Sequence, residues 1–288
     1  MKKTKILILI GISVMVLLSG CIEEKIQNTQ ANKTYERIIS TSPSNTEILF
    51  ALGLEDKVIG VTTYCNYPEE AEEKEKIGGV STVDIELIIN STPDLVLASS
   101  MMKDEDIKKL EGTGIEVVVI DPENIDEILE NIELIGNLTG KEKEALNIAE
   151  NLEKRINKVK ENAENLKKKP KVMYVVWHEP LMSAGRKTFA NDLIEIAGGE
   201  NIYSDTEVQY PTISLESVID RNPDIIITSM GHGDAKNLTY EYIMNEPRLK
   251  NVNAVKNGRV YGIDTDLTGR PGPRIIDGLE RFAEWIQE

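Results

Sequence analysis

The side chains best suited to chemistry are few in this chain. It has two histidines, His178 and His232, and two cysteines, Cys21 and Cys65. Near one cleft the two histidines would together suit a metal or a metal chelate, but single histidines in loops are more often polar lining groups. No G-x-S-x-G, H-E-x-x-H, C-x-x-C or G-x-G-x-x-G sequence occurs, so the common nucleophile, metal and dinucleotide signatures are missing. We therefore expect a protein that is not an enzyme and that has no resident cofactor.

The N-terminus has the pattern of an export signal. Lysines at positions 2, 3 and 5 precede an apolar run over residues 6–18, which is shorter than the roughly 20 residues of a membrane-spanning helix. We predict a signal peptide over residues 1–20. Residues 18–21, Leu-Ser-Gly-Cys, resemble the lipobox of exported lipoproteins. The resemblance implies a lipid on Cys21, a tether over residues 21–35 and a location at the cell membrane, facing outside the cytoplasm. The alternative is an ordinary secretory signal with an incidental cysteine.

If Cys21 carries a lipid, Cys65 has no partner in the chain and no disulfide forms. Cys65 is then either a reactive thiol or ligand contact, or simply a small packed side chain.

The charge of the chain excludes some partners. The formal net charge is −16 at pH 7, and the first 20 residues hold three Lys and no acid, so their removal leaves about −19. Such a surface repels phosphate backbones and anionic lipid headgroups. We therefore expect no nucleic-acid partner, and membrane contact through the lipid anchor only.

Short β-branched runs alternate with helix-like segments along the rest of the chain. This alternation favours an α/β fold with mainly parallel sheets. The runs form two series on either side of a long helical segment, which predicts an N-terminal lobe over residues 36–140 and a C-terminal lobe over residues 170–288. The first series lies at 37–41, 58–62, 94–98 and 115–120, and the second begins at 171, 224 and 259.

Residues 141–169 contain no Gly or Pro and predict one long connecting helix. Its apolar residues recur every three or four positions, which gives one face to pack against both lobes. A rigid helix restricts hinge opening, unlike a glycine-rich linker. The alternative is a coiled-coil dimerisation stalk, which the few heptads disfavour, so we expect a monomer. The apolar face consists of Ala145, Leu146, Ala149, Leu152, Ile156, Val159, Ala163 and Leu166.

An internal repeat supports two similar lobes. Residues 85–97 (IELIINSTPDLVL) match residues 215–227 (LESVIDRNPDIII) at an offset of 130. Each copy predicts a short helix that ends before a proline and leads into a buried strand. The loops after such strands line the ligand crevice of open α/β sheets. Glu86 and Glu216 occupy equivalent positions in the first helical turn, where the helix dipole alone would favour an acid.

Four segments carry a resemblance to a known family: residues 42–48 (SPSNTEI), 64–68 (YCNYP), 78–81 (GGVS) and 197–202 (AGGENI). In order and spacing, over residues 36–287, the chain resembles the substrate-binding proteins of ABC importers for cobalamin, ferric siderophores and haem. It is most similar to their cobalamin-binding branch. The resemblance implies two Rossmann-like α/β lobes with mainly parallel sheets, joined by a single long α-helix, with the ligand between lobes that move little. Ser44 and Glu47 have the spacing of a capping box.

The resemblance also implies roles for individual residues. Glu86 and Glu216 match the family's docking glutamates, which reach arginines on the two subunits of a permease dimer that works with a cytoplasmic ATPase. Tyr64 and Tyr210 match positions where cobalamin-binding relatives place aromatic rings against the ligand, and large flat ligands favour such rings. Trp177 is a candidate replacement ring or a core residue. Other aromatic positions of those relatives are Val83, Ser99 and Leu267 here.

Two arginines complete the candidate ligand site. Arg186 and Arg270 lie in predicted loops containing Gly or Pro, where a guanidinium can bind carboxylates or an anionic chelate. Asp266 and residues 273–275 (PRI) also fit the family pattern near Arg270. We therefore expect an extracytoplasmic binding protein of an ABC importer that carries a metal chelate. A corrinoid is favoured, with a ferric siderophore or haem as the alternative and a surface lipoprotein that binds a protein partner as a further one.

Overall fold

The computed structural model describes residues 34–231 and 237–288. The predicted signal peptide, the lipidation of Cys21, most of the tether and His232 lie outside these residues. Residues Tyr35–Glu288 form one compact unit.

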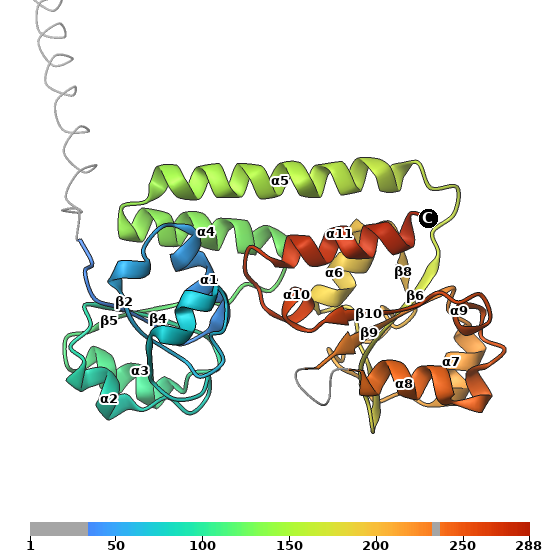
Figure 1. Cartoon of the computed structure of the whole chain (residues 1–288), viewed down its shortest axis with the longest axis horizontal. Coiled ribbons are helices and arrows are strands. Elements are labelled where there is room, and N and C mark those ends of the chain that lie inside the picture. The colour runs from blue at the N-terminus through green and yellow to red at the C-terminus, as the bar shows by residue number, and fades with distance from the viewer. Residues whose placement is uncertain (1–33, 232–236) are drawn as a thin grey trace, which may run out of the picture. The chain divides into compact units, whose positions relative to one another are not determined.

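The N-terminal lobe is a parallel sheet in the order β3-β2-β1-β4-β5 with helices on both faces (Figure 1). Alternate strand residues point to opposite faces. Ile38 and Leu97 share a core cluster with α1 and α4, whereas Ile39 and Val96 share another with α2 and α3. Its strands are β1 (Ile38–Ser40), β2 (Val58–Val61), β3 (Glu75–Lys76), β4 (Leu95–Ala98) and β5 (Glu116–Val119), and its helices are α1 (Pro43–Ala51), α2 (Ile85–Asn90), α3 (Asp104–Glu111) and α4 (Ile125–Thr139).

The C-terminal lobe repeats this plan with the order β10-β9-β6-β7 and β8 beside β6. All pairings are parallel except that of β6 with β7. The predicted fold class, α/β with mainly parallel sheets, is confirmed. Its strands are β6 (Lys171–His178), β7 (Leu181–Ser183), β8 (Glu200–Asn201), β9 (Ile225–Met230) and β10 (Val260–Asp264), and its helices are α6 (Phe189–Ile196), α7 (Leu215–Arg221), α8 (Leu238–Asn245), α9 (Asn253–Lys256), α10 (Asp266–Gly269) and α11 (Ile275–Ile286).

Helix α5 (Glu142–Glu164) runs along both lobes and packs on α4 of the first and on α11 and α6 of the second (Figure 1). Arg155 of α5 donates to Asp277 Oδ1 at 2.6 Å and to both carboxylate oxygens of Glu280, on α11. The helix ends five residues before the predicted limit of 169, and Leu146 of the predicted apolar face is 49% exposed. Four of its buried residues belong to one continuous cluster that joins the cores of both lobes: Ala145, Leu152, Ile156 and Val159.

Candidate ligand-binding site

The carboxyl end of β1 leads directly into α1, beside the end of β4 at the centre of the first sheet. Ser42 caps α1, and its hydroxyl accepts from the backbone N–H of Asn45. The predicted capping box of Ser44 and Glu47 is therefore wrong, because Ser44 already lies within the helix. Asn45 is 1% exposed and its Nδ2 donates to the carbonyl of Ala98, whereas its Oδ1 has no hydrogen-bond partner among the described residues.

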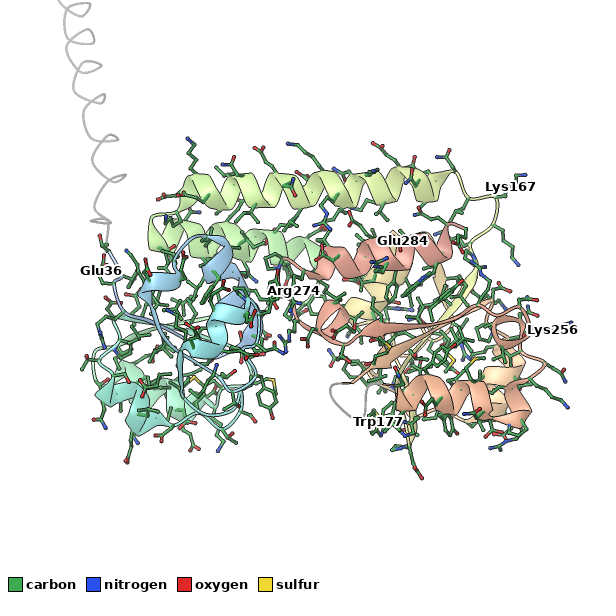
Figure 2. The ribbon with its side chains drawn as sticks, in the orientation of Figure 1. Glu36, Lys167, Trp177, Lys256, Arg274 and Glu284 are labelled. Carbon is green, nitrogen blue, oxygen red and sulfur yellow. The ribbon has the colours of Figure 1, made fainter. Side chains whose placement is uncertain are left out.

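The aromatic candidates are exposed. Tyr64, in the loop after β2, is 60% exposed, Tyr210 is 46% exposed and Trp177 is 38% exposed. Trp177, labelled in Figure 2, lies within β6. It pairs with Met182 of β7 and donates its indole N–H to the carbonyl of Glu179. An isolated bridge places Thr212 beside Met182, so Trp177 and Tyr210 come from neighbouring segments.

Arg270 crosses from the C-terminal lobe to the N-terminal lobe. Its Nε lies 2.9 Å from Asp266 Oδ1, one turn earlier in the chain. Its other nitrogens donate to Asn66 Oδ1 at 2.6 Å and to the backbone carbonyl of Tyr64 at 3.3 Å. The structure thus brings together Arg270 and Tyr64, which are separated by 206 residues in the sequence.

A second arginine makes a bidentate contact across the lobes. Arg274 donates to Glu47 Oε1 at 2.6 Å and to Oε2 at 3.1 Å, and its guanidinium lies over the ring of Tyr67 at 3.7 Å. Burial raises the pKa of Glu47, although Arg274 and Arg270 act in the opposite direction. Burial, the largest single cause, lowers the pKa of Arg274, but the hydrogen bonds to Glu47 and the negative charges of Glu47 and Asp266 together raise it above its usual value.

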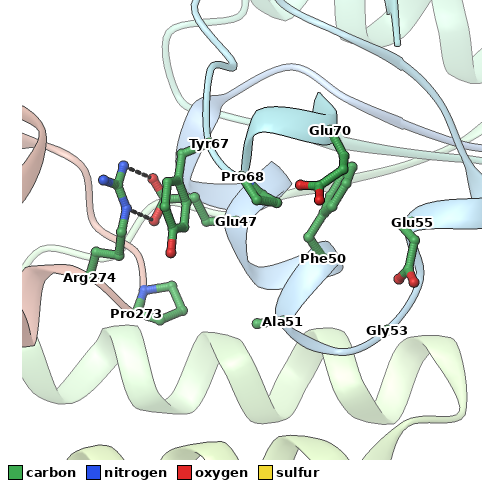
Figure 3. A pocket seen from close by; sticks show the side chains of 10 residues that line it. All are labelled: Glu47, Phe50, Ala51, Gly53, Glu55, Tyr67, Pro68, Glu70, Pro273 and Arg274. Atoms are coloured by element: carbon green, nitrogen blue, oxygen red, sulfur yellow. Dashed lines mark hydrogen bonds and ion pairs between the residues drawn. The ribbon is translucent and has the colours of Figure 1, made fainter. Parts of the chain in front are cut away.

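Glu47 and Arg274 also line a surface pocket of about 480 Å³, shown in Figure 3. Phe50, Pro68 and Pro273 supply apolar walls to this pocket, and the exposed Glu55 lies at its edge. The pairing of Glu47 with Arg274 was not predicted from the sequence. Both residues lie in segments that fit the family pattern, but no local pattern connects positions 227 residues apart.

The remaining candidates lie apart from this contact. Arg186 donates to the carbonyl of Ser204 and pairs with Glu207 at 3.3 Å. His178 stacks at a tilt against Trp177, with ring centroids 4.6 Å apart. Within residues 34–231 and 237–288, no group of three or more His, Cys, Asp and Glu side chains is placed to hold a metal ion.

Glu86 and Glu216 are exposed on the first turns of α2 and α7. Cys65 is a buried free thiol, in hydrogen-bond contact with Thr46 and Thr62 at 3.2 Å each.

Comparison with known proteins decides the family. The sequence profile of the periplasmic binding proteins matches residues 38–267. The chain belongs to the periplasmic binding protein family. It is 36% identical to an uncharacterized ABC transporter substrate-binding lipoprotein, YvrC, of Bacillus subtilis, with 90% of this chain and 82% of that protein covered. It is 29% identical to the vitamin B12-binding protein of Vibrio parahaemolyticus, with 90% of this chain and 92% of that protein covered.

A crystal structure has the same fold as this periplasmic binding protein. It is that of a possible iron-binding, periplasmic solute-binding protein from Staphylococcus epidermidis, with a TM-score of 0.77, 34% identity, and 89% and 100% of the two chains covered. These relatives are binding proteins rather than enzymes, in agreement with the absence of catalytic motifs. None of the helices in the described part of the chain is long and apolar enough to cross a membrane.

Proposed function

We propose that this substrate-binding protein of an ABC importer captures a metal chelate between its lobes, and that the chelate is a corrinoid. The observation that carries the proposal is the cross-lobe arrangement, in which Arg270 reaches from the second lobe to the exposed Tyr64 and its neighbour Asn66 in the first. A ligand at this place contacts both lobes at once. Relatives named as vitamin B12-binding proteins cover most of the chain, which supports a corrinoid over other chelates.

The proposed ligand contacts are Tyr64, Tyr210, Trp177 and Arg270. The exposed rings suit a large flat ligand, because such a ligand buries apolar area against them without rearranging the core. Arg270 adds a cation, although it already holds Asp266 and Asn66. Arg186 remains a weaker candidate, since Glu207 already pairs with it at 3.3 Å.

An iron chelate is the second candidate ligand. It is favoured by the relative named as a possible iron-binding protein, which is 34% identical to this chain. An anionic ferric chelate would depend more on Arg270 and Arg186 than on the aromatic rings, since charge-assisted hydrogen bonds are stronger than neutral ones.

Delivery requires a membrane permease. We propose that Glu86 and Glu216 dock on arginines of the two permease subunits, because each lobe presents the same anchor at the start of an equivalent helix. The proposal includes a lipid on Cys21 that holds the monomeric protein at the outer side of the membrane, where about 0.8 kcal/mol per buried CH₂ group contributes to anchoring.

Equilibrium binding tests the proposal. The purified protein is titrated with cyanocobalamin, cobinamide, haem and a panel of ferric siderophores, with tryptophan quenching and calorimetry as readouts. We expect one-to-one binding of a corrinoid, and weaker binding after Tyr64→Ala or Tyr210→Ala, with Tyr240→Ala as a control outside the proposed contacts. Binding of an iron chelate alone would replace the corrinoid in the proposal. The absence of binding across the panel would refute it and favour a protein partner.

A further inference from the structure

The segment between α10 and α11, residues 270–274 (RPGPR), leaves the C-terminal lobe and lies against α1 of the N-terminal lobe. A Cβ added to Gly272 would lie 3.4 Å from Glu47 Oε2 and 3.5 Å from the backbone of Ser44. A Cβ at position 272 would be in ordinary van der Waals contact with α1, so this segment lies close to that helix. Arg270 and Arg274, on either side of Gly272, both direct their guanidinium groups toward the N-terminal lobe.

The contact between segment and helix is charged and nearly dry. The side chain of Glu47 is 2% exposed, that of Arg274 is 19% exposed and that of Arg270 is 12% exposed. Arg274 binds Glu47 through two hydrogen bonds, and Arg270 Nη1 lies 3.9 Å from the same carboxylate. A buried charge that loses its partner is strongly destabilised. Separation of the lobes at this point would leave the Glu47 carboxylate without either arginine.

Helix α5 connects the lobes along one side, through its packing on α4 and α11. A single connecting helix resists bending, but it does not stop one lobe from rotating about the helix axis. A second point of attachment between the lobes is needed for that. The contact of Glu47 with Arg274 and Arg270 is such a point, because it joins α1 of one lobe to the segment before α11 of the other. Figure 2 shows Arg274 between the two lobes.

We propose that Glu47 is a positioning residue. In this latch, which consists of Glu47, Arg270 and Arg274, the carboxylate fixes the angle between the lobes and holds the Arg270 guanidinium at the ligand site. Tyr67 completes the latch by stacking on Arg274 at 3.7 Å. The role of Glu47 in fixing the angle between the lobes, called the angle part below, depends on the structure alone. Its role in holding Arg270 at the ligand site, called the ligand part, rests on the proposed function.

The angle part is tested by measuring distances between spin labels in the purified protein. The labels are attached through encoded ketone-bearing amino acids at the exposed positions 109 and 256, one in each lobe, so that Cys21 and Cys65 are untouched. The variants are Glu47→Gln, Arg274→Gln and the two combined, and the matched control is Glu55→Gln, which removes an exposed carboxylate at the edge of the same pocket. We expect the distance distribution to widen at least twofold in the three latch variants and to stay unchanged in the control.

The combined variant keeps the test decisive if a single variant fails to fold. It removes both charges together, so no buried charge is left without a partner. Cooperative urea unfolding of the combined variant confirms that it is folded. A wild-type distance distribution in that folded protein would overturn the latch. Arg274→Lys provides partial rescue, because it keeps the charge but loses the bidentate geometry, and it should give an intermediate width.

The ligand part is tested on the same proteins with cyanocobalamin. We expect the Kd to rise at least tenfold in Glu47→Gln and in the combined variant, and less than twofold in Glu55→Gln. An unchanged Kd in a combined variant whose distribution is widened would overturn the positioning role of Glu47. If the wild-type protein binds none of the chelates tested, the proposed function fails, but the distance measurement still decides whether the latch sets the lobe angle.

Discussion

The two copies of the helix–strand repeat, α2–β4 and α7–β9, are alike in backbone and different in electrostatic surroundings. Both helices are capped by a side chain that accepts from the residue three positions on, Asp84 in the first copy and Ser214 in the second. Both strands are preceded by a residue with a φ of 45°, Thr92 and Asn222, which are 130 positions apart. The repeat therefore extends to a left-handed backbone position that the sequence match alone did not reveal.

The charges around the equivalent glutamates differ. Glu216 lies 3.9 Å from Arg248, which also binds Glu246 at 2.9 Å. Among residues 34–231 and 237–288, Glu86 has no ion pair within 4.0 Å. Glu86 and Glu216 thus have the same position in equivalent helices, but an arginine lies near Glu216 alone among the described residues.

The largest effect is expected at the docking glutamates. Glu86→Lys and Glu216→Lys should each lower ligand-dependent transport, or stimulation of the transporter ATPase, at least tenfold, because like charges then face the permease arginines. The ligand Kd should stay within twofold, since neither glutamate is among the proposed ligand contacts. Glu130→Lys, an exposed acid on α4, is the control. Loss of ligand binding in either variant would contradict the docking role.

Two carboxylates hold equivalent strands in place, and their removal should cost stability in both lobes. Asp94 accepts from the backbone N–H groups of Glu36 and Arg37 at 2.8 and 3.1 Å, before β1. Asp224 accepts from the N–H of Lys171 at 3.0 Å, at the start of β6. Hydrogen bonds to charged groups contribute about 1.5–3 kcal/mol each, so we expect Asp94→Ala and Asp224→Ala each to lower the free energy of unfolding by about 2–3 kcal/mol.

Urea unfolding at pH 7 measures this effect, with the exposed Asp220→Ala as the control. Asp→Asn variants keep an acceptor oxygen and should lose about half as much. If only one of the two Asp→Ala variants lowered the free energy of unfolding, the two copies would have the same geometry but contribute differently to stability.

Helix α1 of the first lobe and helix α6 of the second show the same contrast. Thr188 caps α6 as Ser42 caps α1, each accepting from an asparagine N–H three residues on. The acid of α1, Glu47, is bound by arginine, whereas Asp192 of α6 is near Glu195 and Asp126. Burial is the main cause that raises the pKa of Asp192 from 3.8 to about 6, and the two acids add to it.

The raised pKa predicts how stability depends on pH. Between pH 4 and 6 the folded state binds a proton at Asp192 that the unfolded state does not, so the free energy of unfolding falls as the pH rises through this window. Asp192→Asn should therefore stabilise the protein at pH 7.5 by about 1 kcal/mol, a value reduced from the full shift because the carboxylate is partly exposed. At pH 4 the difference should be smaller than at pH 7.5, because the carboxyl is then protonated in the folded state and partly protonated in the unfolded state. Urea unfolding at pH 7.5 and pH 4 measures this difference, with Asp126→Asn as a second variant. If Asp192→Asn gained the same free energy of unfolding at both pH values, the prediction would be refuted.

The elements predicted from the sequence were those with a local cause. The strands came from β-branched runs between turn residues, and Val58–Val61 and Leu95–Ala98 agree with the predicted runs to within one residue. The buried face of α5 came from the recurrence of apolar residues at three and four positions. Strands β3, β7 and β8 were missed, since edge strands of two or three residues carry no period.

The parts of the site that could not be predicted depend on contacts between distant residues. The pattern placed Glu47 in a capping box, because Ser44 stands three residues before it, but Ser42 begins the helix and frees Glu47 for Arg274. Proline at the first helical position, Pro43, was the available signal for the earlier start. No such signal exists for the ion pair, since it depends on how the second lobe approaches α1.

The smallest effect is expected where the two copies share a backbone shape but not a residue type. Thr92 and Asn222 both have a φ of 45°, and in this region a β-branched side chain is strained whereas asparagine is tolerated. Thr92→Asn should raise the free energy of unfolding by about 0.5–1 kcal/mol. The Thr92 side chain is exposed, and the Thr92 backbone carbonyl accepts a hydrogen bond from Arg37 Nε at 3.1 Å. The substitution leaves that backbone contact in place.

The reciprocal change, Asn222→Thr, should act in the opposite direction, since it introduces the strain and also removes the acceptor for the N–H of Asn253 at 2.8 Å. Thr92→Ser, which removes only the branching methyl group, is the matched control and should give a smaller gain than Thr92→Asn. Chemical denaturation at pH 7 resolves differences of this size when the slopes of the transitions are equal. If Thr92→Asn destabilised the protein, the left-handed position of the first copy would need its threonine, and the backbone equivalence of the two copies would not extend to residue preference.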